Sequence, residues 1–152
     1  HVRYLAIRSE LLSILDAIAN LSRLETFLIR GSIDVRLPNT IWTIKTLRHL
    51  FITRSNDYGS RYGFTFPNNL EGSPDLEHLV TLTLAIDPSY QSLQKIPKKF
   101  PSIRRLRCAG LGSYGNGILM LDYLSQVESL KVHGFDGYHF HFNEFENVYS
   151  LI

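Results

Sequence analysis

The amino-acid sequence predicts an α/β protein built as a repeat solenoid, with a curved parallel sheet on its concave side and an irregular convex side. Three observations lead to this class: an apolar phrase recurs along the chain, its copies are nearly evenly spaced, and helical or turn-forming segments separate them. The 152 residues suffice for one domain, and a content of 44% hydrophobic and 20% charged residues is typical of a folded chain.

The recurring phrase consists of four apolar residues: two residues separate each of the first three, and one residue separates the last two. Five full copies begin at Leu21, Ile44, Leu76, Phe100 and Leu124, and partial copies lie at both ends of the chain. The last two apolar positions of each copy alternate, so they lie on one face of a short strand. Each unit can bury its apolar face only against its neighbours, which is why the phrase must repeat.

The spacing of the copies indicates the kind of repeat. One apolar strand position recurs after 22, 23, 32, 24, 24 and 21 residues, at Leu5, Phe27, Leu50, Leu82, Leu106, Leu130 and Leu151. All but one of these steps fall within the roughly 20–29 residues of a leucine-rich repeat. We therefore expect about six to seven leucine-rich repeats in a single domain over residues 1–152. Both ends cut through repeats, so we also expect a fragment of a larger protein.

The segments between the strands differ from one another. Residues 10–20 have apolar side chains at helical spacing and predict a short helix. Residues 37–41 predict an extended or turn-like segment, because Pro38 lacks an amide donor and disfavours helix at the residue before it. Turn-forming residues predict an exposed excursion over residues 55–72, which explains the long step, and a second loop over residues 110–117.

The strand residues that alternate with the buried apolar positions point to the concave face, where stacked repeats place them in three columns. The early half of this face is aromatic and apolar with flanking arginines, and the late half is basic. The candidate partner-binding residues are Tyr4, Arg8, Leu28, Arg30, His49, Phe51, Thr53, Arg105, Arg107, Lys131 and His133. Exposed aromatic residues beside arginine match the composition of interface hot spots. The alternative is that these side chains only solvate the open face of a sheet.

A dinucleotide-binding pattern, GxGxxG, spans residues 110–115 directly after a strand. That strand carries Arg105 and Arg107, whereas the central parallel strand of a dinucleotide-binding fold is nearly all apolar. The leucine-rich repeat also accounts for the apolar residues on both sides of the pattern. We therefore expect no dinucleotide and no other cofactor.

Metal binding and catalysis have weak signals. His139 and His141 share one face of a short strand near His133 and Asp136, an arrangement that could hold a metal. The alternative, which we favour, is that these histidines face water, so we expect no metal site. Cys108 occupies a core position of its strand and should be an inert buried thiol. No catalytic phrase is recognisable, and we expect a protein that is not an enzyme.

A resemblance to a known family adds to these expectations. Residues 37–50 (LPNTIWTIKTLRHL) resemble the repeats of plant intracellular immune receptors, the nucleotide-binding leucine-rich-repeat proteins. Residues 96–106 (IPKKFPSIRRL) and 121–131 (LDYLSQVESLK) look like the late-blight-resistance branch of nightshade plants. The resemblance implies a cytoplasmic sensor whose repeats recognise a pathogen protein and restrain a neighbouring nucleotide-binding module. The phosphate loop of such a module, GxxxxGKS or GxxxxGKT, does not occur in this sequence.

Two other functions stay open at this stage. The chain could be part of an extracellular leucine-rich-repeat receptor that binds a peptide or protein, and a glycan at the Asn20 sequon would favour that reading. A single cysteine excludes an internal disulfide, which favours a reducing compartment over this alternative. No apolar run approaches the ~18 residues of a membrane span, so we expect none. Binding of nucleic acid or acidic lipid through Arg104, Arg105, Arg107 and Lys131 is a lesser alternative, because the net charge is only +2.

Overall fold

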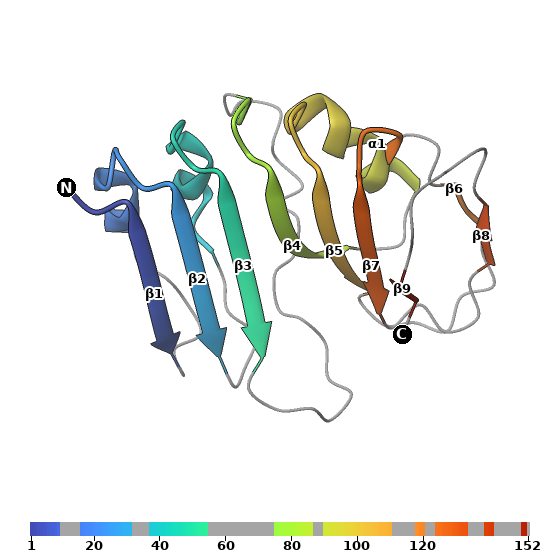
Figure 1. Ribbon diagram of the computed structural model, residues 1–152, viewed down its shortest axis with the longest axis horizontal. Helices are drawn as coiled ribbons and strands as arrows, with labels where there is room; N and C mark the ends of the chain where they lie inside the picture. Colours follow the sequence, from blue (N-terminus) through green and yellow to red (C-terminus); the bar gives the residue numbers. More distant parts are fainter. Residues whose placement is uncertain are drawn as a thin grey trace.

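The computed structural model describes residues 1–9, 16–31, 37–54, 75–86, 90–110, 118–120, 124–133, 139–141 and 150–151. A seven-stranded parallel sheet forms the frame, and its strands follow one another in chain order (Figure 1). Its strands are β1 (Tyr4–Ser9), β2 (Thr26–Gly31), β3 (His49–Arg54), β4 (Thr81–Ile86), β5 (Arg105–Gly110), β7 (Ser129–His133) and β9 (Ser150–Leu151). A second, two-stranded parallel sheet pairs β6 (Ile118–Met120) with β8 (His139–His141).

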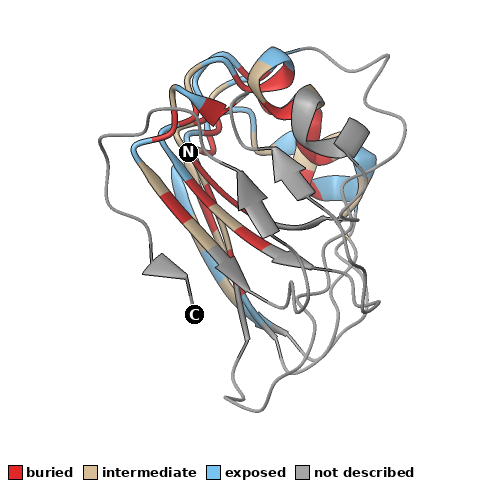
Figure 2. Cartoon of the chain, turned by 90° about the vertical axis from the view of Figure 1, so that its right-hand side faces the viewer, coloured by how far each residue is buried: buried red, intermediate tan, exposed pale blue. Residues whose placement is uncertain are grey.

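This order confirms the predicted α/β leucine-rich-repeat solenoid. Each inner strand of the large sheet pairs with the strand of the preceding repeat and with that of the following repeat, as a one-dimensional stack requires. The helical segments described between strands lie on one face of the sheet (Figures 1 and 2). We call the opposite face the open face, because no helix of the described residues covers it.

The helical segments differ partly from expectation. The described part of residues 10–20 is a 3-10 helix, η1 (Asp16–Asn20), and residues 10–15 lie outside the described part. Within residues 37–41, predicted to be extended or turn-like, the structure has an extended residue followed by a short helical segment. Pro38 is extended, with φ −68° and ψ 148°, but a 3-10 helix, η2 (Asn39–Thr43), begins directly after it. The carbonyl of Pro38 accepts a hydrogen bond from the amide of Ile41 at 3.1 Å, so the first turn of η2 starts at this proline.

A ten-residue helix that the sequence reading did not predict, α1 (Tyr90–Lys99), precedes β5 and contains Pro97. Its C-terminal end is stabilised by apolar packing and by an ion pair. Ile96 and the adjoining Phe100 are fully buried, and the amide of Phe100 donates to the carbonyl of Ile96 at 2.8 Å. The buried Lys99 forms an ion pair with Asp75 at 3.3 Å. The predicted excursion at 55–72 and all but Gly110 of the predicted loop at 110–117 lie outside the described residues.

The core lies between the sheet and the helical segments, and it is built from the repeating phrase (Figure 2). The apolar positions of the five full phrases are buried wherever their side chains are described, except Leu21, which is half-buried. Leu5 and Ile7 of the first strand are half-buried and pack against the same core. The Trp42 ring of η2 contacts the Phe100 ring with centroids 5.6 Å apart, so a side chain before β3 packs against one before β5.

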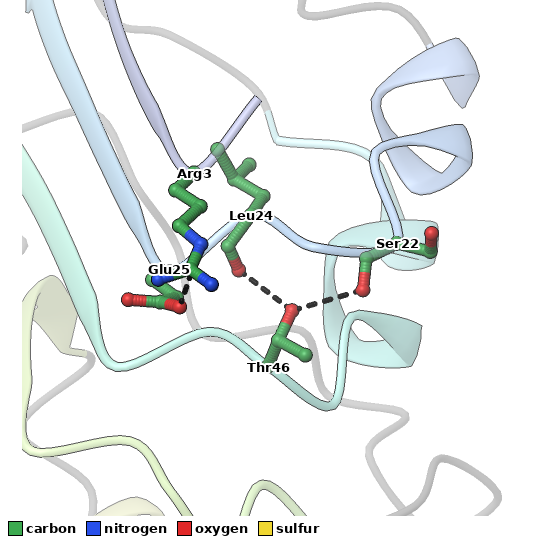
Figure 3. Close-up of polar contacts among 5 residues, drawn as sticks. All are labelled: Arg3, Ser22, Leu24, Glu25 and Thr46. Atoms are coloured by element: carbon green, nitrogen blue, oxygen red, sulfur yellow. Dashed lines mark hydrogen bonds and ion pairs between the residues drawn. The ribbon is translucent and has the colours of Figure 1, made fainter. Parts of the chain in front are cut away.

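Neighbouring repeats are also joined by polar contacts where each strand begins. The carbonyl of Arg3 accepts hydrogen bonds from the amides of Glu25 and Thr26, at 2.8 and 2.9 Å, and the same double contact recurs at the next four strands. The Thr46 hydroxyl donates to the carbonyls of Leu24 and Ser22 in the preceding repeat, at 2.8 and 3.1 Å (Figure 3). These contacts pair backbone groups that the ladder of the sheet does not reach.

Candidate functional site

The candidate site is the open face, and the strand register determines which of its side chains are neighbours. The first predicted column is continuous across six strands as Tyr4, Thr26, His49, Thr81, Arg105 and Ser129. The second column is in register as Ala6, Leu28 and Phe51, and again as Thr83, Arg107 and Lys131. The third column is in register as Arg8, Arg30 and Thr53, and again as Ala85, Ala109 and His133.

The break in the second and third columns falls between β3 and β4. These strands pair over only His49 with Thr81 and Leu50 with Leu82, whereas the other neighbours from β1 to β7 pair over five or six residues. Figure 1 shows the two strands separating towards their C-terminal ends. The longest step of the repeat, 32 residues, lies between these strands. The open face is therefore divided into an early half on β1 to β3 and a late half on β4 to β7.

Most of the predicted partner-binding side chains are accessible on this face. Tyr4 is 60% exposed, and Arg8, Arg30 and Arg105 are also exposed. Five more predicted side chains are half-buried: Leu28, His49, Phe51, Arg107 and Lys131. The side chains of Thr53 and His133 lie outside the described residues, although their backbone positions are in the third column.

Two residues of β4, the first strand of the late half, depart from the expected outward exposure. Thr81 and Thr83 of β4 are only 6% and 3% exposed, although they alternate with the buried Leu82. A short side chain between two longer ones is shielded from water: Thr81 lies between His49 and Arg105 in the first column. The sequence does contain a signal for this burial. It is the presence of short threonine side chains at positions where the neighbouring strands carry larger residues.

The side chain of His49 is held on the open face by two contacts. Its Nδ1 atom lies 3.1 Å from the Thr81 hydroxyl, and its ring stacks on Phe51 with centroids 6.1 Å apart and planes inclined by 13°. Burial lowers the pKa of His49, and the positive charges of Arg105 and Arg48 lower it further. The imidazole is therefore neutral at pH 7, and it forms a stacked aromatic pair with Phe51.

Acidic residues do not occur in the three columns of the described strands, but they lie directly beside these columns. None of the three columns on β1 to β5 and β7 contains an aspartate or glutamate. One residue before the strands, the leading edge carries Arg3, Glu25, Arg48, Val80, Arg104 and Glu128. On this edge Arg3 pairs with Glu25 at 3.6 Å (Figure 3) and Arg104 with Glu128 at 3.8 Å. The basic residues of the leading edge thus have acidic neighbours in the adjoining repeat.

The described residues do not provide evidence for metal binding, dinucleotide binding or a reactive thiol. Within the described part of the chain, no group of three or more His, Cys, Asp and Glu side chains could hold a metal ion. His139 and His141 lie on β8, but their side chains are outside the described set, as is most of the GxGxxG pattern. Cys108 is 2% exposed, and burial raises the pKa of its thiol, as expected of an inert core cysteine. Among the described residues, no helix is long and apolar enough to cross a membrane.

Known proteins similar to this chain include late blight resistance proteins. No family model matches the sequence. Two late blight resistance protein homologues from Solanum demissum are 30% identical to it over 140 and 142 residues, which cover 86% and 90% of this chain. A late blight resistance protein of the same species is 30% identical over 113 residues, or 71% of this chain. The matched regions span only 9%, 18% and 8% of these three relatives, so the chain corresponds to a small part of each.

Proposed function

We infer that this chain, which is homologous over most of its length to a region of the late blight resistance proteins, is a protein-binding segment of a plant disease-resistance receptor. The observation that supports binding is the open face. Its aromatic and arginine side chains stand in register on adjoining strands, and no described helix covers them. In this role the segment acts by contact and catalyses no reaction.

The finer role rests on the same face. We propose that the open face recognises a pathogen protein, restrains the receptor's own nucleotide-binding module, or does both in turn, in the cytoplasm. Six strands spaced by ~4.8 Å present about 25 Å of surface, with about 18 outward positions. This is slightly fewer than the roughly 20–30 residues that a standard interface uses on each side. The segment therefore supplies part of a partner's footprint, and neighbouring repeats of the longer receptor supply the rest.

The test is a pull-down from leaf cytosol, with and without the receptor's nucleotide-binding module. The Phe51→Ala/Arg107→Ala double variant removes one contact from each half of the open face. A matched control, Glu77→Ala/Lys98→Ala, removes two exposed side chains that lie outside the open face. Circular dichroism establishes that each variant is folded.

We expect the Phe51→Ala/Arg107→Ala variant to lose protein partners that the wild type and the control retain. The identity of the lost partner then separates sensing from restraint: the receptor's own module indicates restraint, and a pathogen protein indicates sensing. If all three proteins retain the same partners, the open face is not the binding site and the proposal fails.

A second candidate function is supported by one observation. Asn20, the acceptor of the glycosylation sequon, is exposed at the end of η1. If the chain is part of an extracellular receptor, the protein purified from its native tissue carries a glycan on Asn20. Mass spectrometry of the native protein decides this, and an unmodified Asn20 supports the cytoplasmic proposal.

A further inference from the structure

Two pairs of like charges stand directly opposite each other on the open face. Arg8 of β1 is the register partner of Arg30 of β2, and Arg107 of β5 is the register partner of Lys131 of β7. Adjacent parallel strands lie ~4.8 Å apart, and like charges directly opposite each other on neighbouring strands destabilise a sheet. We call these the early pair (Arg8 and Arg30) and the late pair (Arg107 and Lys131).

The leading edge shows that the same repeats can place charges favourably. There, Arg3 faces Glu25 and Arg104 faces Glu128, each in an ion pair between adjoining repeats. On the open face, by contrast, no aspartate or glutamate stands in any of the three columns to compensate either basic pair. A local arrangement that costs stability without an evident structural gain is expected at a functional site.

From this contrast we propose that the open face binds an acidic segment of a protein, with one acidic cluster on the early pair and another on the late pair. The proposal rests on the protein-binding function inferred above and names the chemistry of the partner. Carboxylates from the partner would relieve the repulsion within each pair and form charge-assisted hydrogen bonds with the guanidinium groups. Arg105, exposed in the first column next to Arg107, adds a further positive charge to the late half.

The surface between the early pair and the late pair indicates which side chains of the partner lie between its two acidic clusters. It contains the half-buried Leu28 and the stacked rings of His49 and Phe51, followed by the buried Thr81 and Thr83. This surface carries no formal charge at pH 7, because the pKa of His49 is lowered. An apolar or aromatic side chain of the partner fits here better than a third acidic group. A nucleic acid fits less well, because its phosphates continue without interruption across such a neutral region.

The distance between the pairs gives the spacing of the acidic clusters. The early and late pairs are centred four strand spacings apart, or about 20 Å. An extended chain covers that distance in about six residues, at ~3.3 Å for each residue. The preferred ligand therefore has two acidic clusters centred about six residues apart, with an apolar residue between them.

Four probes test this inference by fluorescence anisotropy at several salt concentrations. The first is a peptide with two pairs of glutamates separated by four residues that include a phenylalanine. The second has the same composition with all four glutamates adjacent, and the third has lysine in place of every glutamate. The fourth is a single-stranded RNA of about 20 nucleotides, with about one phosphate per nucleotide.

Three variants of the chain complete the test. Arg30→Glu changes the early pair, Arg107→Glu changes the late pair, and Lys45→Glu is the control, an exposed lysine in the turn before β3. Each substitution lowers the formal net charge by two, from +2 to 0, so only position distinguishes them. Both open-face variants replace a like pair with an opposite pair. We therefore expect them to unfold at slightly higher urea concentration than the wild type, which excludes misfolding as the cause of lost binding.

We expect the spaced acidic peptide to bind the wild-type chain more tightly than the other three probes do. Its affinity should decrease as the salt concentration rises. Arg30→Glu and Arg107→Glu should each lower its affinity by about tenfold at physiological salt, and Lys45→Glu by less than about twofold. The proposal of an acidic partner is wrong if the lysine peptide binds as tightly as the spaced acidic peptide or if the RNA binds more tightly. It is also wrong if Lys45→Glu lowers the affinity as much as the open-face variants do. Equal binding of the peptide with adjacent glutamates overturns the two-cluster arrangement.

Failure of this inference is separable from failure of the proposed function. If the Phe51→Ala/Arg107→Ala variant loses cytosolic partners but the four probes are not discriminated, the open face binds proteins by other chemistry and only the acidic inference fails. If that variant retains every cytosolic partner, the protein-binding role of the open face fails, whichever probe binds.

Discussion

At the scale of single residues, His49 connects the open face to pH. Its folded-state pKa is lowered by burial and by Arg105 and Arg48, whereas an unfolded histidine titrates near its model value of 6.5. The unfolded chain therefore takes up a proton more readily than the folded chain as pH falls through 6.5. We expect the contribution of His49 to the free energy of unfolding to be constant above about pH 7.5 and to decrease as pH falls towards 5.5.

Urea unfolding at pH 7.5, 6.5 and 5.5 measures this dependence. His49→Gln should reduce the loss of stability at low pH, because glutamine does not titrate. His78→Gln is the control, since His78 is exposed in the turn before β4. Equal pH dependence in the wild type and in the His49→Gln variant would contradict the prediction. Nuclear magnetic resonance titration of the imidazole should give a pKa below 6.5 for His49.

Single positions also show what sequence could predict about the site. The first column follows from the repeat alone, because counting from the inward-facing Leu5, Phe27 and Leu50 fixes which neighbouring residues face outward. The burial of Thr81 and the contact of His49 with its hydroxyl could not be predicted in this way. They depend on the relative lengths of side chains on adjoining strands, which the period of a repeat does not encode.

At the scale of elements, the strands were predictable and the return segments were not. Each of the strands β1 to β5 and β7 has two alternating apolar positions that must be buried, so its place in the sequence is fixed by pattern. The short strands β8 and β9 do not have this pair of positions. The α1 helix carries Pro97 in its last turn, and intrinsic preference argues against a helix there. The buried Ile96 and Phe100, four residues apart, show that tertiary packing selects the helix. Propensity is a weak prior where a tertiary contact of this kind is available.

The η2 segment gives an element-scale prediction through Trp42. This side chain is 2% exposed and packs against the fully buried Phe100. Trp42→Ala leaves a large cavity between η2 and the residue after α1, and we expect it to lower the free energy of unfolding by about 3–5 kcal/mol. Trp42→Phe retains most of the ring contact, so it should lower the free energy of unfolding clearly less than Trp42→Ala does. Urea unfolding measures both variants, and equal costs would show that the ring contact contributes little.

At the scale of the whole molecule, the stack is joined unevenly. In a solenoid, stability is close to a sum of repeat terms and nearest-neighbour interface terms. From β1 to β7, the shortest strand pairing is between β3 and β4, where two residue pairs replace the five or six found elsewhere. The described side-chain contacts across this junction include the His49–Thr81 hydrogen bond and the Trp42–Phe100 ring contact. Because the pairing at this junction is the shortest, we expect the two halves of the open face to belong to two parts of the stack that open separately.

Hydrogen exchange of backbone amides tests this consequence. We expect the amides of β1, β2 and β3 to share one opening free energy and those of β4, β5 and β7 to share another, because a cooperative unit ends where the interface is weakest. Trp42→Ala should widen the difference between the two groups, since it removes a side chain that joins them. One opening free energy common to all six strands, unchanged by Trp42→Ala, would show that the β3–β4 junction transmits stability as well as the longer pairings do. In that case a ligand bound across both halves of the open face would gain no affinity from holding the halves together. If the halves open separately, such a ligand should slow amide exchange in the early half and in the late half at the same time.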